Sequence, residues 1–230
     1  MMEMKGICVQ HTGRRLLIAG CFFFLLTTVL PAFAQKDAKA KEWLDKSSEV
    51  FGKTGALSVD FTINVKDVSN KISESFDGNI EMKGAKFHLD VPEMETWFDG
   101  KTQWVLQKEW DEVNITEPAE QEVQTLNPAV IFSIYKKGCN YKYLGEKTDN
   151  RGKKAQEIEL IPQDKKSEWT KIVIQINSND FMPVKIHIFY KNKMENIIHI
   201  NKYKKKLNLE DNVFVFDKKK YPNVEIIDLR

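Results

Sequence analysis

The sequence predicts a mainly β fold: one curled sheet or open barrel of about eleven antiparallel strands, with an N-terminal helix and one further short helix. Three observations support this fold class. The 230 residues are 42% hydrophobic and 30% charged, with only 11 glycines and 7 prolines, which excludes collagen-like and disordered classes. Apolar and polar residues alternate with a period of two along most of the chain after residue 56. Two segments depart from this alternation and have the features of helices.

Residues 1–34 have the pattern of a secretory signal peptide. Lys5, Arg14 and Arg15 precede an apolar run at residues 16–30, which is too short to span a membrane. Pro31 ends the run, and residues 32–34 (Ala-Phe-Ala) form an A-x-A cleavage site. We therefore expect cleavage after residue 34 and a single mature domain at residues 35–230.

A second interpretation of the leader stays open. Residues 17–21 (Leu-Ile-Ala-Gly-Cys) resemble the lipobox of bacterial lipoproteins, in which the cysteine is acylated. Only a short apolar run precedes Cys21, however, and the strongest apolar stretch, at residues 22–26, follows it. Because the apolar region of a signal peptide precedes its cleavage point, we favour a soluble mature protein.

Removal of the leader changes the charge and the cysteine content. It leaves 32 basic and 32 acidic residues, so the mature protein carries no net charge. A strong overall attraction to nucleic acid is thereby excluded, and we expect no nucleic-acid partner. Cys139 is the one cysteine that remains, so no intramolecular disulfide can form and the domain must rely on its apolar core.

The first mature segment predicts a helix at residues 36–52, because its apolar residues share one helical face and Gly52 is placed to end it. The period then changes to two, and Asp77-Gly78 suggests a bulge within one strand. Asp99-Gly100, between apolar runs, predicts a hairpin. Strands are expected at residues 57–65, 72–82, 87–91, 97–98, 104–106, 113–116, 141–143, 157–161, 170–176, 184–190, 194–203, 213–216 and 224–227.

Residues 127–137 predict a short, unusually apolar helix. Asn127 is a good N-cap and Pro128 a good first helical residue. The apolar side chains that follow include Val130, Ile131, Phe132 and Ile134. Such a helix either plugs one end of the barrel permanently or acts as a lid that leaves an interior cavity when a ligand enters. The residues alone leave both interpretations open.

Several segments together resemble the periplasmic outer-membrane lipoprotein carrier family. They are residues 76–80 (Phe-Asp-Gly-Asn-Ile), 83–87, the hairpin 97–104 with its Asp-Gly-Lys-Thr-x-Trp motif, and the closing segments 213–216 and 221–228. The resemblance spans nearly all of the mature chain. It implies an open half-barrel in which a helical lid covers a hydrophobic cavity for lipoprotein acyl chains. It also implies transport between an inner-membrane exporter and an outer-membrane acceptor.

A carrier of this kind needs an apolar concavity rather than catalytic groups, because each buried CH₂ contributes about 0.8 kcal/mol. The candidate cavity residues are Phe61, Ile63, Phe76, Ile80, Phe87, Leu89, Trp97 and Trp104. The candidate lid residues are Asn127, Pro128, Val130, Ile131, Phe132 and Ile134.

Lys83 is a candidate cargo-handling residue. Members of the family that it resembles carry an arginine a few residues before the phenylalanine of the third strand, and alignment on Phe87 places Lys83 there. Lysine keeps the charge but lacks the planar, bidentate geometry of a guanidinium group.

Enzymatic function has little support in the sequence. His88, His187 and His199 lie in separate predicted strands without H-E-x-x-H or H-x-H spacing, and no nucleophile or phosphate-binding motif is present. We expect no catalytic residue, metal or cofactor. The favoured function is a monomeric periplasmic carrier of acylated lipoproteins. The alternative is an envelope sensor or scaffold that binds a protein or lipid partner with a similar half-barrel, because fold alone does not separate the two.

Overall fold

The computed structural model describes residues 37–118, 135–136, 138–149 and 151–230. All of them belong to the compact unit Ala34–Arg230. The expected signal peptide, its cleavage site, Cys21 and the lid residues at 127–134 lie outside the described ranges. These expectations therefore stay predictions.

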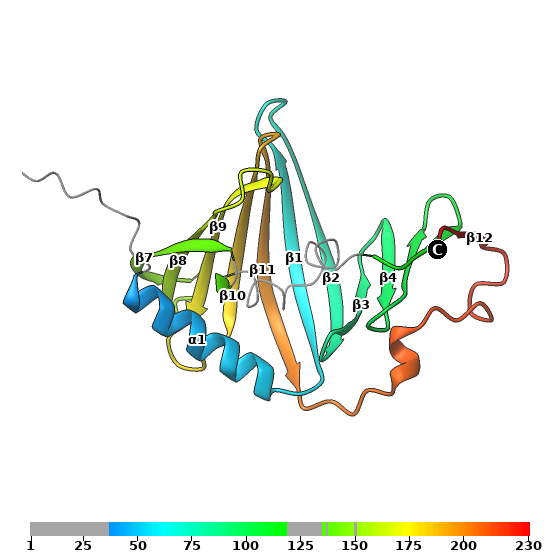
Figure 1. Cartoon of the computed structure of the whole chain (residues 1–230), viewed down its shortest axis with the longest axis horizontal. Helices are drawn as coiled ribbons and strands as arrows, with labels where there is room; N and C mark the ends of the chain where they lie inside the picture. Colours follow the sequence, from blue (N-terminus) through cyan, green and yellow to red (C-terminus); the bar gives the residue numbers. More distant parts are fainter. Residues whose placement is uncertain (1–36, 119–134, 137, 150) are drawn as a thin grey trace, which may run out of the picture. The chain divides into compact units, whose positions relative to one another are not determined.

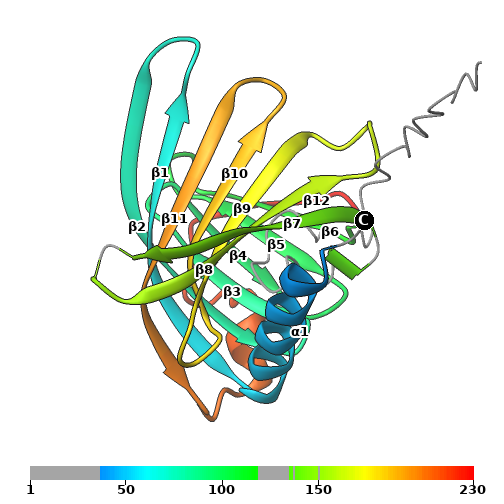
Figure 2. The same ribbon diagram turned by 90° about the vertical axis from the view of Figure 1, so that its left-hand side faces the viewer.

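The described residues form one open sheet of twelve strands, in the order β12-β6-β5-β4-β3-β2-β1-β11-β10-β9-β8-β7 (Figures 1 and 2). The first and last strands of this order do not pair with each other, so the sheet is not closed, as predicted. The strands are β1 (Leu57–Asp67), β2 (Ile72–Lys83), β3 (Lys86–Asp90), β4 (Met94–Phe98), β5 (Gln103–Gln107), β6 (Glu112–Thr116), β7 (Cys139–Thr148), β8 (Lys154–Pro162), β9 (Trp169–Asn177), β10 (Pro183–Tyr190), β11 (Met194–Lys205) and β12 (Glu225–Asp228).

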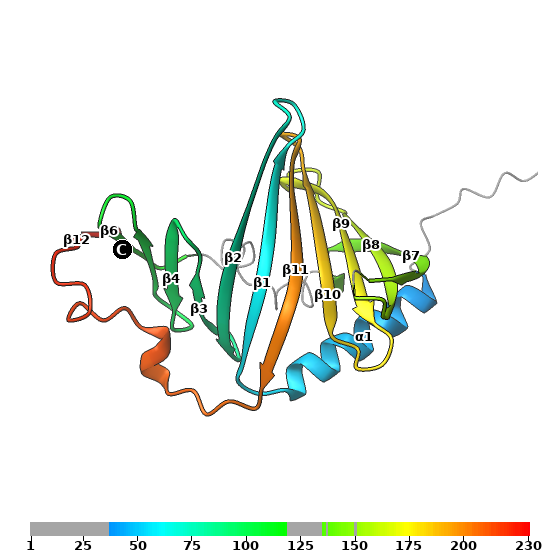
Figure 3. The ribbon, with the colours of Figure 1, turned by 180° about the vertical axis from the view of Figure 1, so that it is seen from behind.

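Two antiparallel meanders make up the sheet. Strands β1 to β6 form one and β7 to β11 form the other, and β1 joins them by pairing with β11 along its whole length (Figure 3). Strand β12 differs from the prediction of antiparallel strands throughout, because it runs parallel to β6. Residues 117–224 separate β6 from β12 in the chain, which is ample for the crossover connection that parallel pairing requires.

Helix α1 (Ala38–Lys53) confirms the predicted N-terminal helix. The Asp37 side chain caps it by accepting hydrogen bonds from the backbone N–H groups of Lys39 and Ala40 at 2.9 and 3.1 Å. The same carboxylate accepts a hydrogen bond from the Tyr143 N–H at 3.0 Å, which attaches the start of the helix to β7. These backbone donors, Tyr143 first, hold the pKa of Asp37 below its ordinary value.

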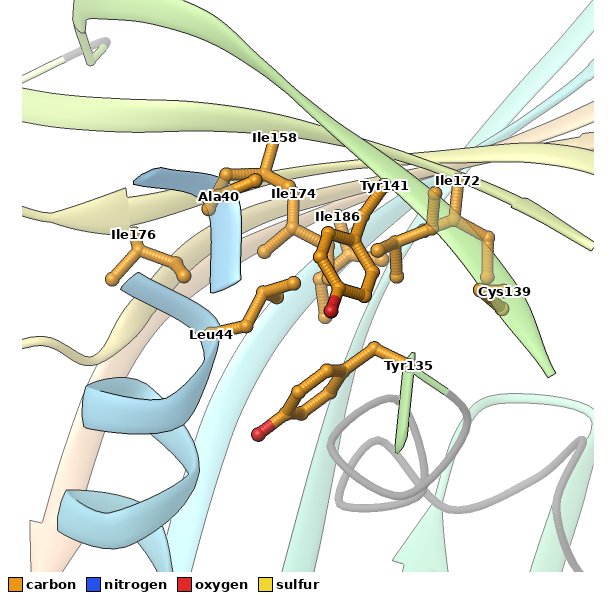
Figure 4. Packing of buried hydrophobic residues seen from close by; sticks show 11 residues of the cluster. Ala40, Leu44, Tyr135, Cys139, Tyr141, Ile158, Ile172, Ile174, Ile176 and Ile186 are labelled. Atoms are coloured by element: carbon orange, nitrogen blue, oxygen red, sulfur yellow. The ribbon is translucent and has the colours of Figure 1, made fainter. Parts of the chain in front are cut away.

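The helix packs on one face of the sheet, which we call the inner face (Figure 4). Ala40 and Leu44 of α1 contact a layer of isoleucines from β8, β9 and β10. Tyr135, which is helical together with Lys136, packs against the same layer and is only 2% exposed. Farther along the inner face, a second cluster joins residues of β1, β2, β3 and β4.

The C-terminal segment covers the opposite, outer face of β3 to β6. Val224 packs there with Trp97, Leu106, Val113 and Ile115, and Phe216 and Tyr221 lie against the same cluster. Strand β4 therefore carries large apolar side chains on both faces, with Phe98 on the inner face and Trp97 on the outer face.

Two local predictions are wrong. Residues 213–216 do not form a strand: Asp211–Phe214 form the 3₁₀ helix η2, whose Phe214 is fully buried beside β3 and β4. Gly78 does not mark a bulge, because β2 pairs with β1 in unbroken register. The irregularity lies instead between Asp60 and Phe61 of β1, where the register to β11 shifts.

Candidate functional site

An apolar cavity of about 270 Å³ lies on the inner face, where β10, β11, β1 and β2 run side by side (Figures 1 and 3). Residues of α1, β3, β4, β9 and the turn after β3 complete its wall. Its lining is Phe51, Val59, Phe61, Ile63, Phe76, Ile80, Met82, Leu89, Val91, Met94, Ile174, Pro183, Ile186, Ile188, Tyr190, Asn196, Ile198, Ile200 and Tyr203.

The pairing register explains why so many apolar side chains converge. Ile63 of β1 lies opposite Phe76 of β2 and Ile198 of β11, and Ile198 lies opposite Ile186 of β10. Residues that are directly opposite in neighbouring strands point to the same face of a sheet. The alternation in each strand therefore adds up to one continuous apolar surface.

Five of the predicted cavity residues line the cavity: Phe61, Ile63, Phe76, Ile80 and Leu89. They come from three consecutive strands, β1, β2 and β3. Their placement agrees with the expectation, and their role in binding a ligand stays a prediction.

Phe87 lies on the inner face but is not part of the cavity wall. It is fully buried between Met82, its partner in β2, and Phe98, its partner in β4. The Phe87 and Phe98 ring centroids are 5.5 Å apart. Phe87 is therefore part of the hydrophobic core that β2, β3 and β4 form beside the cavity.

Trp97 and Trp104 also differ from the expectation, because the structure places them on the outer face. Trp97 lies opposite His88 and Trp104, one residue out of phase with the inward-facing Phe87 and Phe98. Since neighbouring residues in a strand point to opposite faces, both tryptophans point away from the cavity. The Trp97 ring packs edge-on against Phe216 and Tyr221 of the C-terminal segment, with centroids 5.4 and 5.6 Å apart.

Lys83 is likewise outside the cavity. Its neighbour Met82 lines the cavity, so Lys83 points outward. Its ammonium group donates to the Leu209 carbonyl at 2.8 Å and lies 3.1 Å from the Asp211 carboxylate. Lys86 contacts the second oxygen of Asp211 at 2.8 Å. Both lysines therefore attach η2 to the sheet, and a cargo-handling role for Lys83 stays a prediction.

Sequence reasoning missed the half of the wall that β9, β10 and β11 provide. The five missed isoleucines are Ile174, Ile186, Ile188, Ile198 and Ile200. Their alternation was visible in the sequence, but their place beside β1 depends on the long-range pairing of β1 with β11. That pairing joins residues more than 120 positions apart, and no local signal specifies it.

The cavity wall contains few polar atoms. Asn196 donates a hydrogen bond from Nδ2 to the Tyr190 hydroxyl oxygen at 3.3 Å, and the Tyr203 hydroxyl donates to the Pro183 carbonyl at 2.9 Å. Burial raises the pKa of Tyr190 and of Tyr203, so both phenols stay protonated near neutral pH. The wall is therefore uncharged.

The titratable clusters of the described residues lie away from the cavity. His88 contacts Glu95 at 2.7 Å on the outer face, and His187 contacts Glu195 at 2.9 Å. Burial lowers the pKa of His187, although Glu195 opposes this shift. Within the described ranges, no group of His, Cys, Asp and Glu could hold a metal ion, and no helix is long and apolar enough to cross a membrane.

Comparison with solved structures shows a related fold. An uncharacterized conserved protein from Thermus thermophilus superimposes with a TM-score of 0.55 at 12% identity, over 83% of this chain and 99% of the other. A putative outer membrane lipoprotein-sorting protein domain from Vibrio parahaemolyticus has a TM-score of 0.43 at 13% identity, covering 79% and 99%. A LolA superfamily protein from Nitrosomonas europaea has 0.42 at 13%, covering 77% and 97%. At 12% identity, the likeness to the Thermus thermophilus protein concerns the fold alone.

Comparison of the sequence itself identifies the family. No curated protein sequence matches the chain. The sequence model described as outer membrane lipoprotein carrier protein LolA, however, matches residues 30–192, which is well over half of the chain. The open sheet with its N-terminal helix agrees with this match. The chain therefore belongs to the LolA family of outer membrane lipoprotein carrier proteins.

Proposed function

We propose that this protein is a periplasmic carrier that binds the acyl chains of lipoproteins in the inner-face cavity and transports them from the inner to the outer membrane. The observation that carries the proposal is the apolar cavity on the inner face, which the strands β1, β2, β10 and β11 build together. Family membership supports the same class of cargo.

The size and chemistry of the cavity suit a hydrocarbon ligand. An apolar cavity of about 150 Å³ in a protein core stays dry and binds benzene. The present cavity, at about 270 Å³, has room for a longer hydrocarbon. Since each CH₂ that leaves water contributes about 0.8 kcal/mol, an acyl chain gains binding free energy without any charged contact.

The proposal includes a cellular setting. The leader directs the chain to the periplasm, and the mature protein acts as a monomer without cofactor or catalysis. Its partners are acylated lipoproteins, an inner-membrane exporter and an outer-membrane acceptor. The lack of charge in the cavity wall is consistent with binding rather than chemical conversion, because acid–base and nucleophilic catalysis need reactive groups beside the ligand.

A displacement assay on the mature protein tests the proposal. A fluorescent fatty-acid analogue should bind to the folded protein, and a diacylated lipopeptide should displace it. Ile198→Phe should weaken probe binding, because the larger ring fills the cavity. Ile197→Phe is the matched control: the residue is adjacent in β11 but points to the outer face, so the probe should bind as in the wild type.

The outcomes separate the two candidate functions. Exclusion of the probe at every concentration from a folded protein would contradict the carrier proposal. Displacement by the same peptide without its acyl chains would instead support the envelope sensor or scaffold, since a protein segment would then be the ligand.

A further inference from the structure

The polar groups of the cavity wall lie at its two ends. Asn196 and Tyr190 are at one end, beside the turn that connects β10 and β11. Tyr203 lies seven residues farther along β11, which corresponds to about 23 Å of extended strand. The wall between them is made of isoleucine, valine, phenylalanine, leucine and methionine side chains. A ligand that fills the cavity therefore meets polar atoms only at its ends.

The two ends of the cavity differ in whether their polar groups already form hydrogen bonds within the protein. The Tyr203 hydroxyl donates to the Pro183 carbonyl at 2.9 Å, so its proton is engaged. The Tyr190 hydroxyl only accepts a hydrogen bond, from Asn196 Nδ2 at 3.3 Å. No described residue accepts the Tyr190 proton or donates to Asn196 Oδ1. The Tyr190–Asn196 end thus offers one donor and one acceptor to a ligand.

A polar group that faces an apolar cavity without a partner is costly, whereas one that meets a matching ligand atom favours binding. Burial raises the pKa of Tyr190 and keeps it a neutral donor. A neutral donor beside an amide suits an ester or amide group better than a phosphate or carboxylate, because no positive charge accompanies it.

We infer that Tyr190 and Asn196 form a polar subsite for the ester-linked glyceryl end of an acylated cargo, with the acyl chains extending toward Tyr203 and Phe51. This inference rests on the proposed carrier function. The Tyr190 hydroxyl donates to an ester carbonyl oxygen, and Asn196 Oδ1 accepts a hydrogen bond from the backbone amide N–H of the residue that follows the lipidated cysteine.

The position of the subsite sets the orientation of the cargo. Asn196 lies opposite Val65 of β1, and the turn after β1 meets the turn before β11 where the Val68 N–H donates to the Lys193 carbonyl at 3.2 Å. Figure 1 shows the β1–β2 and β10–β11 turns together at the top of the sheet. Residues 191–193 of the second turn are exposed. The polypeptide attached to the glyceryl group therefore leaves the cavity at this end.

The test compares two synthetic lipopeptides that differ in one feature. One carries a dipalmitoylglyceryl group on its N-terminal cysteine, and the other carries dihexadecylglyceryl ether chains, which lack the carbonyl oxygens. The wild-type protein should bind the ester about three- to tenfold more tightly, the effect of one net hydrogen bond. Tyr190→Phe should reduce this preference toward one while still binding the ether, whereas Asn196→Leu should weaken the binding of both lipopeptides. Tyr221→Phe is the matched control: this tyrosine lies on the outer face, where its hydroxyl donates to Glu95 at 2.7 Å, so the variant should keep the preference.

The possible results distinguish the inference from the proposed function. If the folded wild-type protein binds neither lipopeptide, the carrier function itself fails. If it binds both equally, if Tyr190→Phe leaves the preference unchanged, or if Asn196→Leu leaves both affinities unchanged, the carrier function stands and the polar subsite is overturned. Thermal melts of each variant confirm that the folded state is compared throughout.

Discussion

The Phe61 ring lies over Gly78, its direct partner in the neighbouring strand β2. A Cβ atom on residue 78 would be 2.5 Å from Phe61 Cζ and 2.9 Å from Val91 Cγ1. Both of these side chains line the cavity. Because non-bonded carbon atoms do not approach so closely, glycine at this position lets the ring lie flat against the sheet and leaves the cavity open.

Gly78→Ala should therefore reduce both stability and ligand capacity. The added methyl group forces the Phe61 ring toward the cavity, and such overpacking typically costs about 1–3 kcal/mol. We expect a lower midpoint of urea unfolding and weaker binding of the fluorescent fatty-acid analogue. Both effects are measured on the purified mature protein.

A double-mutant cycle isolates the cause. Phe61→Leu removes the ring that the new methyl group would meet, so Gly78→Ala should cost less in the Phe61→Leu background than in the wild type. Additive changes in the free energy of unfolding would mean that the contact between the ring and residue 78 is not the reason for the glycine.

The interpretation of Gly78 illustrates what sequence patterns can specify. Period-two alternation identified the strands, because each strand carries its own signal. The same pattern could not reveal why a glycine interrupts β2: a bulge and a close aromatic neighbour look identical in one strand. The Phe61 partner is 17 positions away, and it is the register of β1 with β2 that brings the two together.

The sequence pattern also could not predict which face of the sheet each apolar side chain of β3 to β6 occupies. Apolar side chains lie on both faces of this part of the sheet: Phe87 and Leu89 of β3 point inward, while Trp97 of β4 and Trp104 of β5 point outward. Only the C-terminal segment, with Phe216 and Tyr221, explains the outer apolar face. This segment covers the outer face through tertiary contacts, which the alternation within single strands does not indicate. The alternating Val-Phe-Val-Phe of residues 213–216 resembles a strand, although Asp211–Phe214 form a 3₁₀ helix.

Lys83 allows a direct test of a structural against a cargo-handling role. Hydrogen bonds from Lys86 and Lys83 hold the pKa of Asp211 below its ordinary value of 3.8. The stabilising contribution of Asp211 is thus complete above that ordinary value and is lost as the pH falls through the lowered pKa. The stability difference between wild type and Asp211→Asn should therefore shrink when urea unfolding is repeated from about pH 7 down to pH 2.

Lys83→Met should reproduce part of the Asp211→Asn effect, and the two changes together should be less than additive. Because Lys83 and Asp211 are solvent-exposed and Lys86 is partly exposed, each change should be small. Binding of the diacylated lipopeptide should be unaltered by Lys83→Met. Loss of lipopeptide binding without loss of stability would point to the cargo-handling role instead.

Tyr135 connects the end of the apolar segment at 127–137 to helix α1. Its hydroxyl donates to Asp45 Oδ1 at 2.8 Å, and its ring is almost fully buried against Tyr141. Tyr135→Phe should cost about 1 kcal/mol, since it removes one hydrogen bond to a partly exposed carboxylate. Tyr135→Ala should cost about 3–5 kcal/mol, because it also leaves a cavity in the core.

The titration of Asp45 provides a second measurement. Burial would raise the pKa of Asp45, but hydrogen bonds from Lys41 and Tyr135 outweigh burial and lower it. Tyr135→Phe should therefore raise the pKa of Asp45 in an NMR titration. An unchanged pKa would show that the hydroxyl does not interact with Asp45 in solution.

Trp97 tests the assignment of the two faces of the sheet. It is 4% exposed and contacts Phe216 and Tyr221 on the face opposite the cavity. Trp97→Ala should cost about 3–5 kcal/mol, because it removes a large side chain from a closed cluster. The affinity of the folded variant for the fatty-acid analogue should equal that of the wild type.

Trp110→Ala is the matched control, because it makes the same substitution at an exposed site. Trp110 is 69% exposed, so the free energy of unfolding should hardly change. If Trp97→Ala instead preserved the unfolding midpoint and abolished probe binding, Trp97 would belong to the ligand site and the described packing of the C-terminal segment would be incorrect.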